Sequence, residues 1–280
     1  MQALQAITLG LLQGVTELFP ISSLGHSVLL PPLLHSQLDE SAPSFLIFLV
    51  ATHAATALVL FAFYFSDWMK IAGGMLHSLR TRRILEENTY GKIGWLLVVS
   101  TVPAGILGIL FEKSIQGFFA TPLYVALFLV GNGALLFGAE RLRRSRTSVG
   151  AAVDKRIASL SWNQAIGIGC MQCLALFPGF SRTGASLAGG LLSGFSHEEA
   201  MRYAFLLATP IIAAAAVLKL PELWGSEMGS LGIVLLGTVC AALGAYVSVR
   251  FLTHYFKTRT LVPFAVYCTF AGLVSLVLMR

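Results

Sequence analysis

Two short stretches of the chain nearly repeat each other, and both contain polar groups inside otherwise apolar sequence. The first, 13–26, reads QGVTELFPISSLGH, and the second, 172–186, reads QCLALFPGFSRTGAS. When the two LFP triplets are aligned, Ser23 falls on Ser181. Two further pairs of segments match at nearly the same separation: 49–52 with 206–209, and 102–103 with 262–263. The sequence therefore predicts a duplication, with a first repeat in 1–145 and a second in 160–280, each opened by a proline-broken polar segment.

The composition restricts the class of protein in which such a duplication can occur. The chain is 56% hydrophobic and only 11% charged, with a mean hydropathy of +0.79, whereas ordinary soluble domains are about 25% charged. Apolar runs of the length that crosses a bilayer as an α-helix lie near 44–65, 93–111, 121–141, 200–219, 230–253 and 261–279. The segments 6–34 and 163–192 are apolar but interrupted. We expect an all-α polytopic membrane protein with about six full spans, forming a single membrane domain over 1–280.

The net charge of +6 could indicate nucleic-acid binding, but the distribution of the basic residues argues against it. They cluster in alternate connections between spans, around 70–92, 141–156 and 250–259, whereas 35–43, 112–120 and 219–229 contain few. This alternation is the positive-inside pattern of membrane proteins, and it predicts that the basic connections are cytoplasmic. We therefore expect lipid, and no nucleic acid, among the partners.

The same alternation predicts how the two halves are oriented. Three full spans follow the first broken segment, so the second half starts from the opposite face of the membrane. The charge pattern then requires each broken segment to return to the side from which it entered. This is an inverted-topology repeat with two re-entrant helix pairs, which meet near the middle of the membrane. Irregular backbone at that depth must be buried in protein or line a watered cavity.

The polar residues of the two broken segments are candidates for a site at this junction, because polar and ionisable groups are costly in lipid. Gln13 and Glu17 are four residues apart and share one helix face. Pro20 is expected to end that helix, and the following serines to cap the next one. The full candidate set is Gln13, Glu17, Ser22, Ser23, His26, Gly179, Ser181, Arg182, Thr183 and Ser186.

Hydroxyls, an arginine and free amide groups at helix starts suit an anion with several oxygens, above all phosphate. Glu17 and His26 are not needed merely to hold phosphate. They predict acid–base chemistry or metal ligation. His53 lies inside a span, where packing or hydrogen-bond support is at least as good an interpretation as catalysis. Cys170 and Cys173 lack the additional ligands of a zinc site.

ELFPISSLGH and LFPGFSRTGAS resemble the two signature motifs of the undecaprenyl-diphosphatase family, also called bacitracin-resistance proteins. The resemblance in length and hydropathy extends over essentially the whole chain. It implies a phosphatase of the bacterial plasma membrane that hydrolyses undecaprenyl diphosphate to the monophosphate, so that the lipid carrier is recycled for cell-wall peptidoglycan. It also implies a need for a divalent cation, Mg²⁺ or Ca²⁺.

By the same resemblance, Glu17 is the second carboxylate of an (E/Q)-x-x-x-E motif, in which Gln13 takes the first position. These two residues would be the metal ligands, and Glu17, His26, Ser23 and Arg182 the catalytic residues. Ser22, Gly179, Ser181, Thr183 and Ser186 would bind the phosphate groups. The attacking group is Ser23, a water molecule or His26.

A polyprenyl-phosphate flippase is the alternative from another class, because transporters with inverted repeats also bind anions at the centre of the membrane. The predicted topology opens the site to the periplasmic or outer face. A homodimer is compatible with the sequence.

Overall fold

The computed structural model describes residues 1–33, 43–84, 87–119, 121–143, 152–223 and 231–279. In these ranges the regular structure is helical, apart from one isolated bridge between Pro178 and Phe180. Five helices are long and apolar enough to cross a membrane: α3 (Pro43–Phe63), α5 (Thr89–Phe119), α6 (Pro122–Leu142), α10 (His197–Leu223) and α11 (Leu231–Tyr255). α12 (Val262–Leu278) is a shorter apolar helix at the sixth predicted position. The predicted polytopic α-helical membrane protein is confirmed.

Both proline-broken segments form a helix, a break and a second helix. In the first, α1 (Ala3–Leu18) is followed by α2 (Ser23–Leu33). In the second, α8 (Trp162–Gln172) continues into the 3₁₀ turn η1 (Cys173–Leu176) and is followed by α9 (Arg182–Leu192). Pro20 and Pro178 lie in the two breaks, where a residue without a backbone N–H is tolerated. The predicted interruptions are confirmed, and their re-entrance into a membrane stays a prediction.

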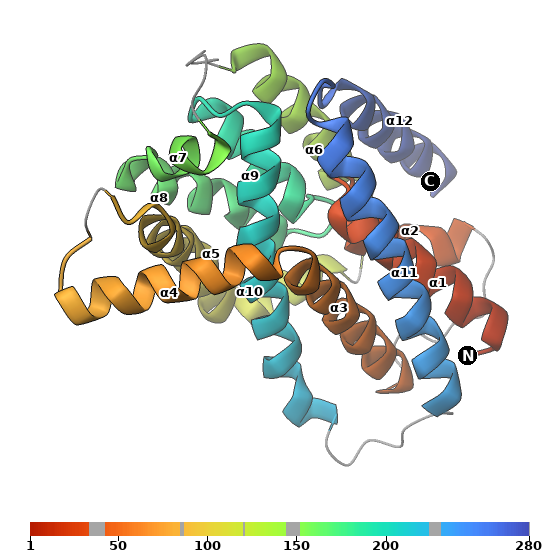
Figure 1. Cartoon of the computed structure of the whole chain (residues 1–280). Coiled ribbons are helices and arrows are strands. Elements are labelled where there is room, and N and C mark those ends of the chain that lie inside the picture. Colours follow the sequence, from red (N-terminus) through yellow and green to blue (C-terminus); the bar gives the residue numbers. More distant parts are fainter. Residues whose placement is uncertain (34–42, 85–86, 120, 144–151, 224–230, 280) are drawn as a thin grey trace.

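The helices of each half pack against helices of the other half. α1 lies along α11, and its counterpart α8 lies against α5, while α6 packs on α12 and α3 on α10 (Figure 1). The contacts of α1 with α11 and of α8 with α5 are especially close. A Cβ at Gly14 would overlap the Ala241 carbonyl oxygen, and a Cβ at Gly169 would overlap the Ser100 carbonyl oxygen. This pairing pattern is what a two-fold relation between duplicated halves produces. It supports the predicted duplication, whose boundaries and inverted orientation stay predictions.

Two helices lie in connections where the sequence analysis places no element. α4 (Phe65–Thr81) runs across the direction of the neighbouring long helices and packs on α5 (Figure 1). α7 (Val153–Ala158) is a single short helix that contacts α5 and α10. The Tyr90 hydroxyl donates to Asp154 at 2.8 Å, and Arg143 Nη1 lies 3.4 Å from His197 Nδ1. The first contact joins the 70–92 connection to the 141–156 connection, and the second joins the end of α6 to the start of α10.

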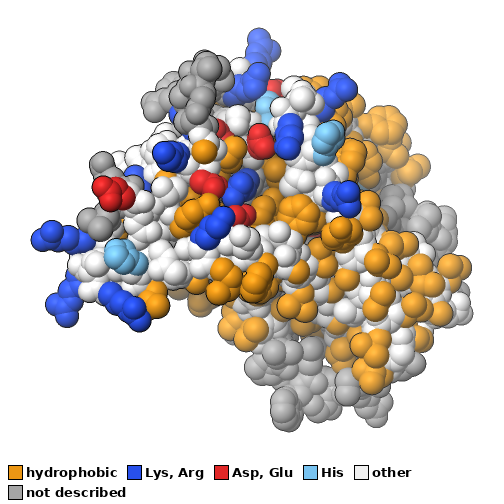
Figure 2. All heavy atoms as spheres, viewed as in Figure 1, with side chains coloured by type: hydrophobic (Ala, Val, Ile, Leu, Met, Phe, Trp, Pro, Cys, Tyr) orange, Lys and Arg blue, Asp and Glu red, His pale blue; other side chains and the backbone are white. Residues whose placement is uncertain are grey.

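Figure 2 shows Lys and Arg side chains gathered over the upper and left parts of the molecule, and mainly hydrophobic side chains over the lower right. Side chains on the outer faces of the long helices are strongly exposed, among them Ile109 (76%) on α5 and Val277 (73%) on α12. Exposed apolar faces of this kind are suited to contact with lipid.

Candidate functional site

The two broken segments meet directly. Thr183 Oγ1 donates to the Glu17 carbonyl oxygen at 3.2 Å, and Ser181 Oγ donates to the Phe19 carbonyl oxygen at 3.3 Å. Asn132, fully buried in the middle of α6, joins both loops. Its Nδ2 donates to the Pro20 carbonyl oxygen at 3.0 Å, and its Oδ1 accepts from the Ser181 amide at 3.1 Å. The predicted junction of the two segments is therefore present.

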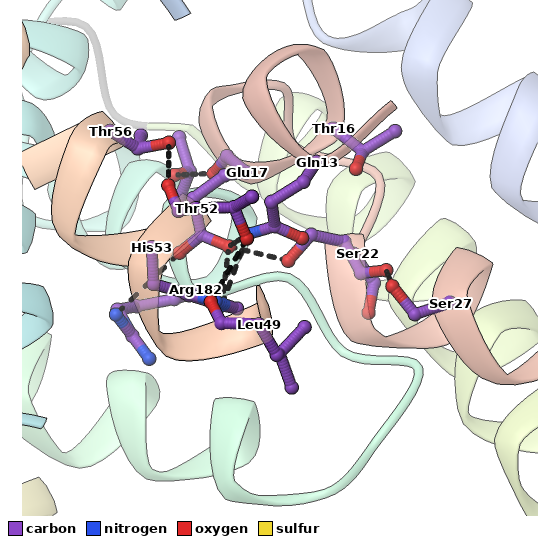
Figure 3. A network of polar contacts seen from close by, with 12 residues as sticks. Gln13, Thr16, Glu17, Ser22, Ser27, Leu49, Thr52, His53, Thr56 and Arg182 are labelled. Carbon is purple, nitrogen blue, oxygen red and sulfur yellow. Dashed lines mark hydrogen bonds and ion pairs between the residues drawn. The ribbon is translucent and has the colours of Figure 1, made fainter. Parts of the chain in front are cut away.

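The carboxylate of Glu17 is the centre of the polar network at this junction (Figure 3). Its Oε2 accepts a 2.5 Å hydrogen bond from Ser23 Oγ and a 3.0 Å hydrogen bond from Gln13 Nε2. Arg182 Nη1 lies 3.7 Å from Oε1, and the carboxylate is almost completely buried. A buried carboxylate is stabilised only by such donors and cations, so Gln13, Ser23 and Arg182 form one unit with Glu17.

His53 on α3 belongs to the same unit. Its Nε2 lies 3.0 Å from Gln13 Nε2 and 3.4 Å from Glu17 Oε2, while Nδ1 lies 2.8 Å from the Leu49 carbonyl oxygen. The neutral tautomer that satisfies these contacts carries its proton on Nδ1 and directs the Nε2 lone pair towards Gln13. The sequence analysis weighed packing or hydrogen-bond support against catalysis for His53. The structure places it in direct polar contact with Gln13 and beside the carboxylate.

His26, by contrast, bonds away from Glu17. Its Nδ1 lies 2.6 Å from the Ser22 carbonyl oxygen, and its Nε2 lies 2.7 Å from the Tyr267 hydroxyl on α12. The two rings are stacked, with centroids 5.7 Å apart. Ser186 also points elsewhere, because its Oγ donates to Gln172 Oε1 on α8 at 3.3 Å. The side chains of His26 and Ser186 therefore bond to partners other than the Glu17 carboxylate.

The two serine caps reveal a difference in register between the loops. Ser22 Oγ accepts from the Gly25 amide, and Ser181 Oγ accepts from the Gly184 amide, both at 3.1 Å. Ser22, and not Ser23, is therefore the structural counterpart of Ser181. The second loop has one additional residue between its proline and its cap, which the alignment on the LFP triplets did not accommodate.

This register makes Ser23 the counterpart of Arg182, since each follows its cap and is the first residue of its helix. The breaks also use unusual backbone: Ser22 has φ of 69° and Gly179 has φ of 110°. A Cβ on Gly179 would overlap the Val125 carbonyl oxygen. Gly179 is thus required by the turn and by its close contact with α6, and it does not line the cavity described next.

A cavity of about 20 Å³ lies between the two helix starts. Its lining residues come from both loops, from α3 and from η1: Glu17, Ser22, Ser23, Leu24, His53, Ala175, Phe180, Ser181 and Arg182. The N-termini of α2 and α9 both border it, and a helix N-terminus favours negative charge. The volume suffices for a water molecule. A diphosphate group is larger than this cavity, so it enters only when lining side chains move.

Glu17, which lines the cavity, and Gln13, which contacts Glu17, carry oxygen atoms that fit a cation held jointly with a phosphate. Gln13 Oε1 is buried without a hydrogen-bond partner, and it lies in the same side chain that bonds to Glu17. Within the described ranges, three or more His, Cys, Asp or Glu residues do not cluster as a metal site. Mg²⁺ is commonly bound by one or two protein ligands together with substrate phosphates. Glu17 and Gln13 could supply such oxygen ligands.

The sequence analysis missed Asn132 and Tyr267, which fix the loops and His26. Both lie in apolar spans, where an amide or a phenol hydroxyl needs a buried partner. Asn132 carried a usable signal, because it is the one amide within the apolar run 122–138. Tyr267 carried none, since tyrosine is common on membrane helices.

Comparison with known proteins agrees with the resemblance of the two motifs. Residues 6–274 match the family described as bacitracin resistance protein BacA. A protein named undecaprenyl-diphosphatase from Mycolicibacterium paratuberculosis is 44% identical over 98% of this chain and 96% of its own length. One of the same name from Acidiphilium cryptum is 42% identical over 99% and 98%, respectively. Undecaprenyl-diphosphatase 2 from Frankia alni is 40% identical over 96% and 95%.

Proposed function

The chain belongs to the bacitracin resistance protein BacA family, and we propose that it hydrolyses undecaprenyl diphosphate to undecaprenyl phosphate and phosphate at the Glu17 cavity. The observation that carries this assignment is the Glu17 carboxylate, which accepts a 2.5 Å hydrogen bond from Ser23 beside an arginine and two helix N-termini. A carboxylate in contact with a hydroxyl, at a cavity suited to an anion, is an arrangement that can activate a nucleophile for attack on a phosphoanhydride.

In the proposed reaction, Ser23 Oγ attacks the terminal phosphorus while its proton passes to Glu17. The bond between that phosphorus and the bridging oxygen breaks, and its electron pair leaves with undecaprenyl phosphate. A water molecule then hydrolyses the phosphoserine, releases phosphate and restores the serine. Arg182 and the amides at the starts of α2 and α9 neutralise the charge on the equatorial oxygens.

Two other attacking groups remain open for this step. A water molecule could be activated by Glu17 directly, in which case Ser23 only orients the carboxylate. His26 is the third, although its Nε2 bonds to Tyr267 in the structure. His53 is placed to orient the Glu17–Gln13 pair in each version, because it contacts both side chains.

We propose that Glu17 and Gln13 also bind a divalent cation, Mg²⁺ or Ca²⁺, together with the diphosphate. The unpartnered Gln13 Oε1 supports this role. When bound, the cation supplies additional neutralisation of the phosphate charge. Ser22, Ser181 and Thr183 hold the two loops in the geometry that binds the anion, since each bonds to backbone there.

The experiment that tests this function is phosphate release from undecaprenyl diphosphate by purified protein in detergent. We expect Glu17→Gln to lower turnover by about 10³-fold, because it removes the base but keeps the size of the side chain. The control is Glu87→Gln, which changes an exposed glutamate. Chelation of divalent cations should abolish release, and Mg²⁺ or Ca²⁺ should restore it. A folded wild type that moves intact lipid phosphate across vesicles without releasing phosphate would favour the flippase alternative instead.

The chain is a multi-pass membrane protein, and we propose that it resides in the bacterial plasma membrane with the Glu17 cavity open to the outer face. The alternating basic connections support this orientation. A single cysteine introduced in the 144–151 connection should react with a membrane-impermeant reagent only from the cytoplasmic side. Labelling from outside would reverse the orientation. Light scattering in detergent would test whether the protein forms a homodimer.

A further inference from the structure

A second polar pocket lies at the basic end of the molecule and shares no lining residue with the Glu17 cavity. Its volume is about 210 Å³, roughly ten times that of the catalytic cavity. The pocket is formed by the end of α6, the start of α10 and the connection between α11 and α12. The side chains that matter for its chemistry are Arg143, Ser196, His197, Lys257, Thr258 and Arg259.

The pocket is held in shape by the carboxylate of Glu140 beneath it. Glu140 Oε2 accepts from the Leu261 amide at 3.0 Å and lies 2.8 Å from His197 Nε2, so it ties the α11–α12 connection to the start of α10. His197 stacks parallel to the Phe256 ring, and the Tyr255 hydroxyl donates to the Thr260 carbonyl oxygen. A connection fixed by these contacts does not need to be ordered when a ligand binds.

The charge of the lining favours an anion. Arg143, Lys257 and Arg259 are opposed by one lining carboxylate, Glu198. Arg143 is already engaged, with its Nε 3.4 Å from Glu140 Oε1. Lys257 and Arg259 form no ion pair with any residue that the structure describes, and both are exposed. The positive-inside pattern explains why this end of the molecule is basic, but not why two free cations border a preformed pocket beside hydroxyl groups.

The position of the pocket suits a ligand at a membrane surface. The outer faces of the helices that lead into it expose apolar side chains: Phe251 is 49% exposed, Val262 37% and Val266 52%. These faces would contact lipid, so the end of the helices lies at the depth of lipid headgroups. Basic pockets between helix ends are typical binding sites for anionic headgroups.

We propose that this pocket binds a phosphate group, carried by an anionic lipid headgroup or free in solution. Lys257 and Arg259 pair with the phosphate oxygens, and the hydroxyls of Thr258 and Ser196 donate hydrogen bonds to them. The site is separate from the one that hydrolyses the substrate, and it does not depend on that assignment.

The test measures binding to purified wild type and to the double variant Lys257→Gln/Arg259→Gln. The matched control is Arg80→Gln/Arg83→Gln, which removes two exposed arginines at the end of α4 outside the pocket. One arm counts phosphatidylglycerol retained by the protein in native mass spectrometry, with phosphatidylcholine for comparison. The other arm titrates inorganic phosphate by calorimetry into protein held in phosphatidylcholine nanodiscs. Equal elution volumes and melting temperatures show that the variants are folded, and Lys257→Glu provides a second, single substitution.

We expect the pocket variant to bind about 30-fold more weakly and the α4 control to bind like wild type. Dependence of phosphatidylglycerol retention on the pocket identifies a lipid headgroup as the ligand. If only the binding of inorganic phosphate depends on the pocket, the ligand is free phosphate. Equal loss in both double variants, or no loss in either, overturns the proposal, because the basic residues then act only through their total charge.

Discussion

The loops 13–26 and 172–186 share a backbone design and differ in chemistry. Each contains a proline, a serine that caps the next helix and a glycine three residues after the cap. The first loop contributes the carboxylate of Glu17 and the hydroxyl of Ser23, whereas the second contributes the guanidinium of Arg182. The shared backbone design supplies two helix N-termini around one cavity. The two loops differ in the residues that they bring to it, because the carboxylate comes from one loop and the guanidinium from the other.

The sharpest test of this division compares the two serines that the sequence alignment equated. Ser23→Ala should lower turnover by at least about 10³-fold, because in the proposed reaction it removes the attacking oxygen while Glu17 stays in place. Ser181→Ala removes a cap and should cost about 1 kcal/mol of stability, with turnover within tenfold of wild type. The measurements are phosphate release and thermal unfolding in detergent. Substantial turnover by Ser23→Ala would make water or His26 the attacking group.

The next test addresses Arg182, the positively charged residue of the second loop. Arg182→Gln should reduce turnover by about 10²- to 10³-fold, since in the proposed reaction Arg182 neutralises the phosphate oxygens in the transition state. Arg182→Lys keeps the charge but not the planar fork and should recover part of the loss. Arg250→Gln, at an exposed position on α11, is the control. A glutamine variant with more than a tenth of wild-type turnover would remove Arg182 from the catalytic group.

The sequence was sufficient for most of the fold, because span length and hydropathy are local properties. It was also sufficient for the two breaks, which follow from Pro20 and Pro178. α4 was missed because an amphipathic helix with exposed basic residues at its end resembles a polar connection. The register of the second loop was missed because a single inserted residue leaves the LFP triplets aligned while it shifts the caps.

The site was predicted as a set of residues but not as a geometry. Gln13, Glu17, Ser23 and Arg182 do meet, as the two-motif pattern indicates. The roles of His53 and Asn132 depend on how α3 and α6 pack against loops that are distant in the sequence. Periodicity within one helix contains no information about such contacts. The structure also directs His26 and Ser186 to other partners, which the motif pattern does not reveal.

The hydrogen bond between His26 and Tyr267 allows a test of whether His26, on the first loop, takes part in the reaction. Tyr267→Phe removes the hydroxyl 2.7 Å from His26 Nε2 and leaves the stacked ring in place. If His26 transfers a proton in the reaction, we expect turnover to fall by about tenfold and the pH profile of kcat to shift. Tyr246→Phe, at an exposed position on α11, is the control. An unchanged pH profile would assign His26 a structural role at the start of α2.

The smallest effect is expected at Ser186, which the motif resemblance groups with the phosphate-binding residues. In the structure its hydroxyl is buried and donates to Gln172 Oε1 at 3.3 Å, so it joins α9 to α8 instead of facing the cavity. Ser186→Ala should therefore lower the free energy of unfolding by about 1 kcal/mol and leave KM and kcat within about twofold of wild type. Thr183→Val is the matched comparison, because Thr183 bonds to the Glu17 carbonyl oxygen and its loss should disturb both stability and turnover. If Ser186→Ala instead raised KM for the diphosphate tenfold without loss of stability, the helix that carries Arg182 would have to rotate when substrate binds. The second loop would then be the mobile partner of a fixed first loop.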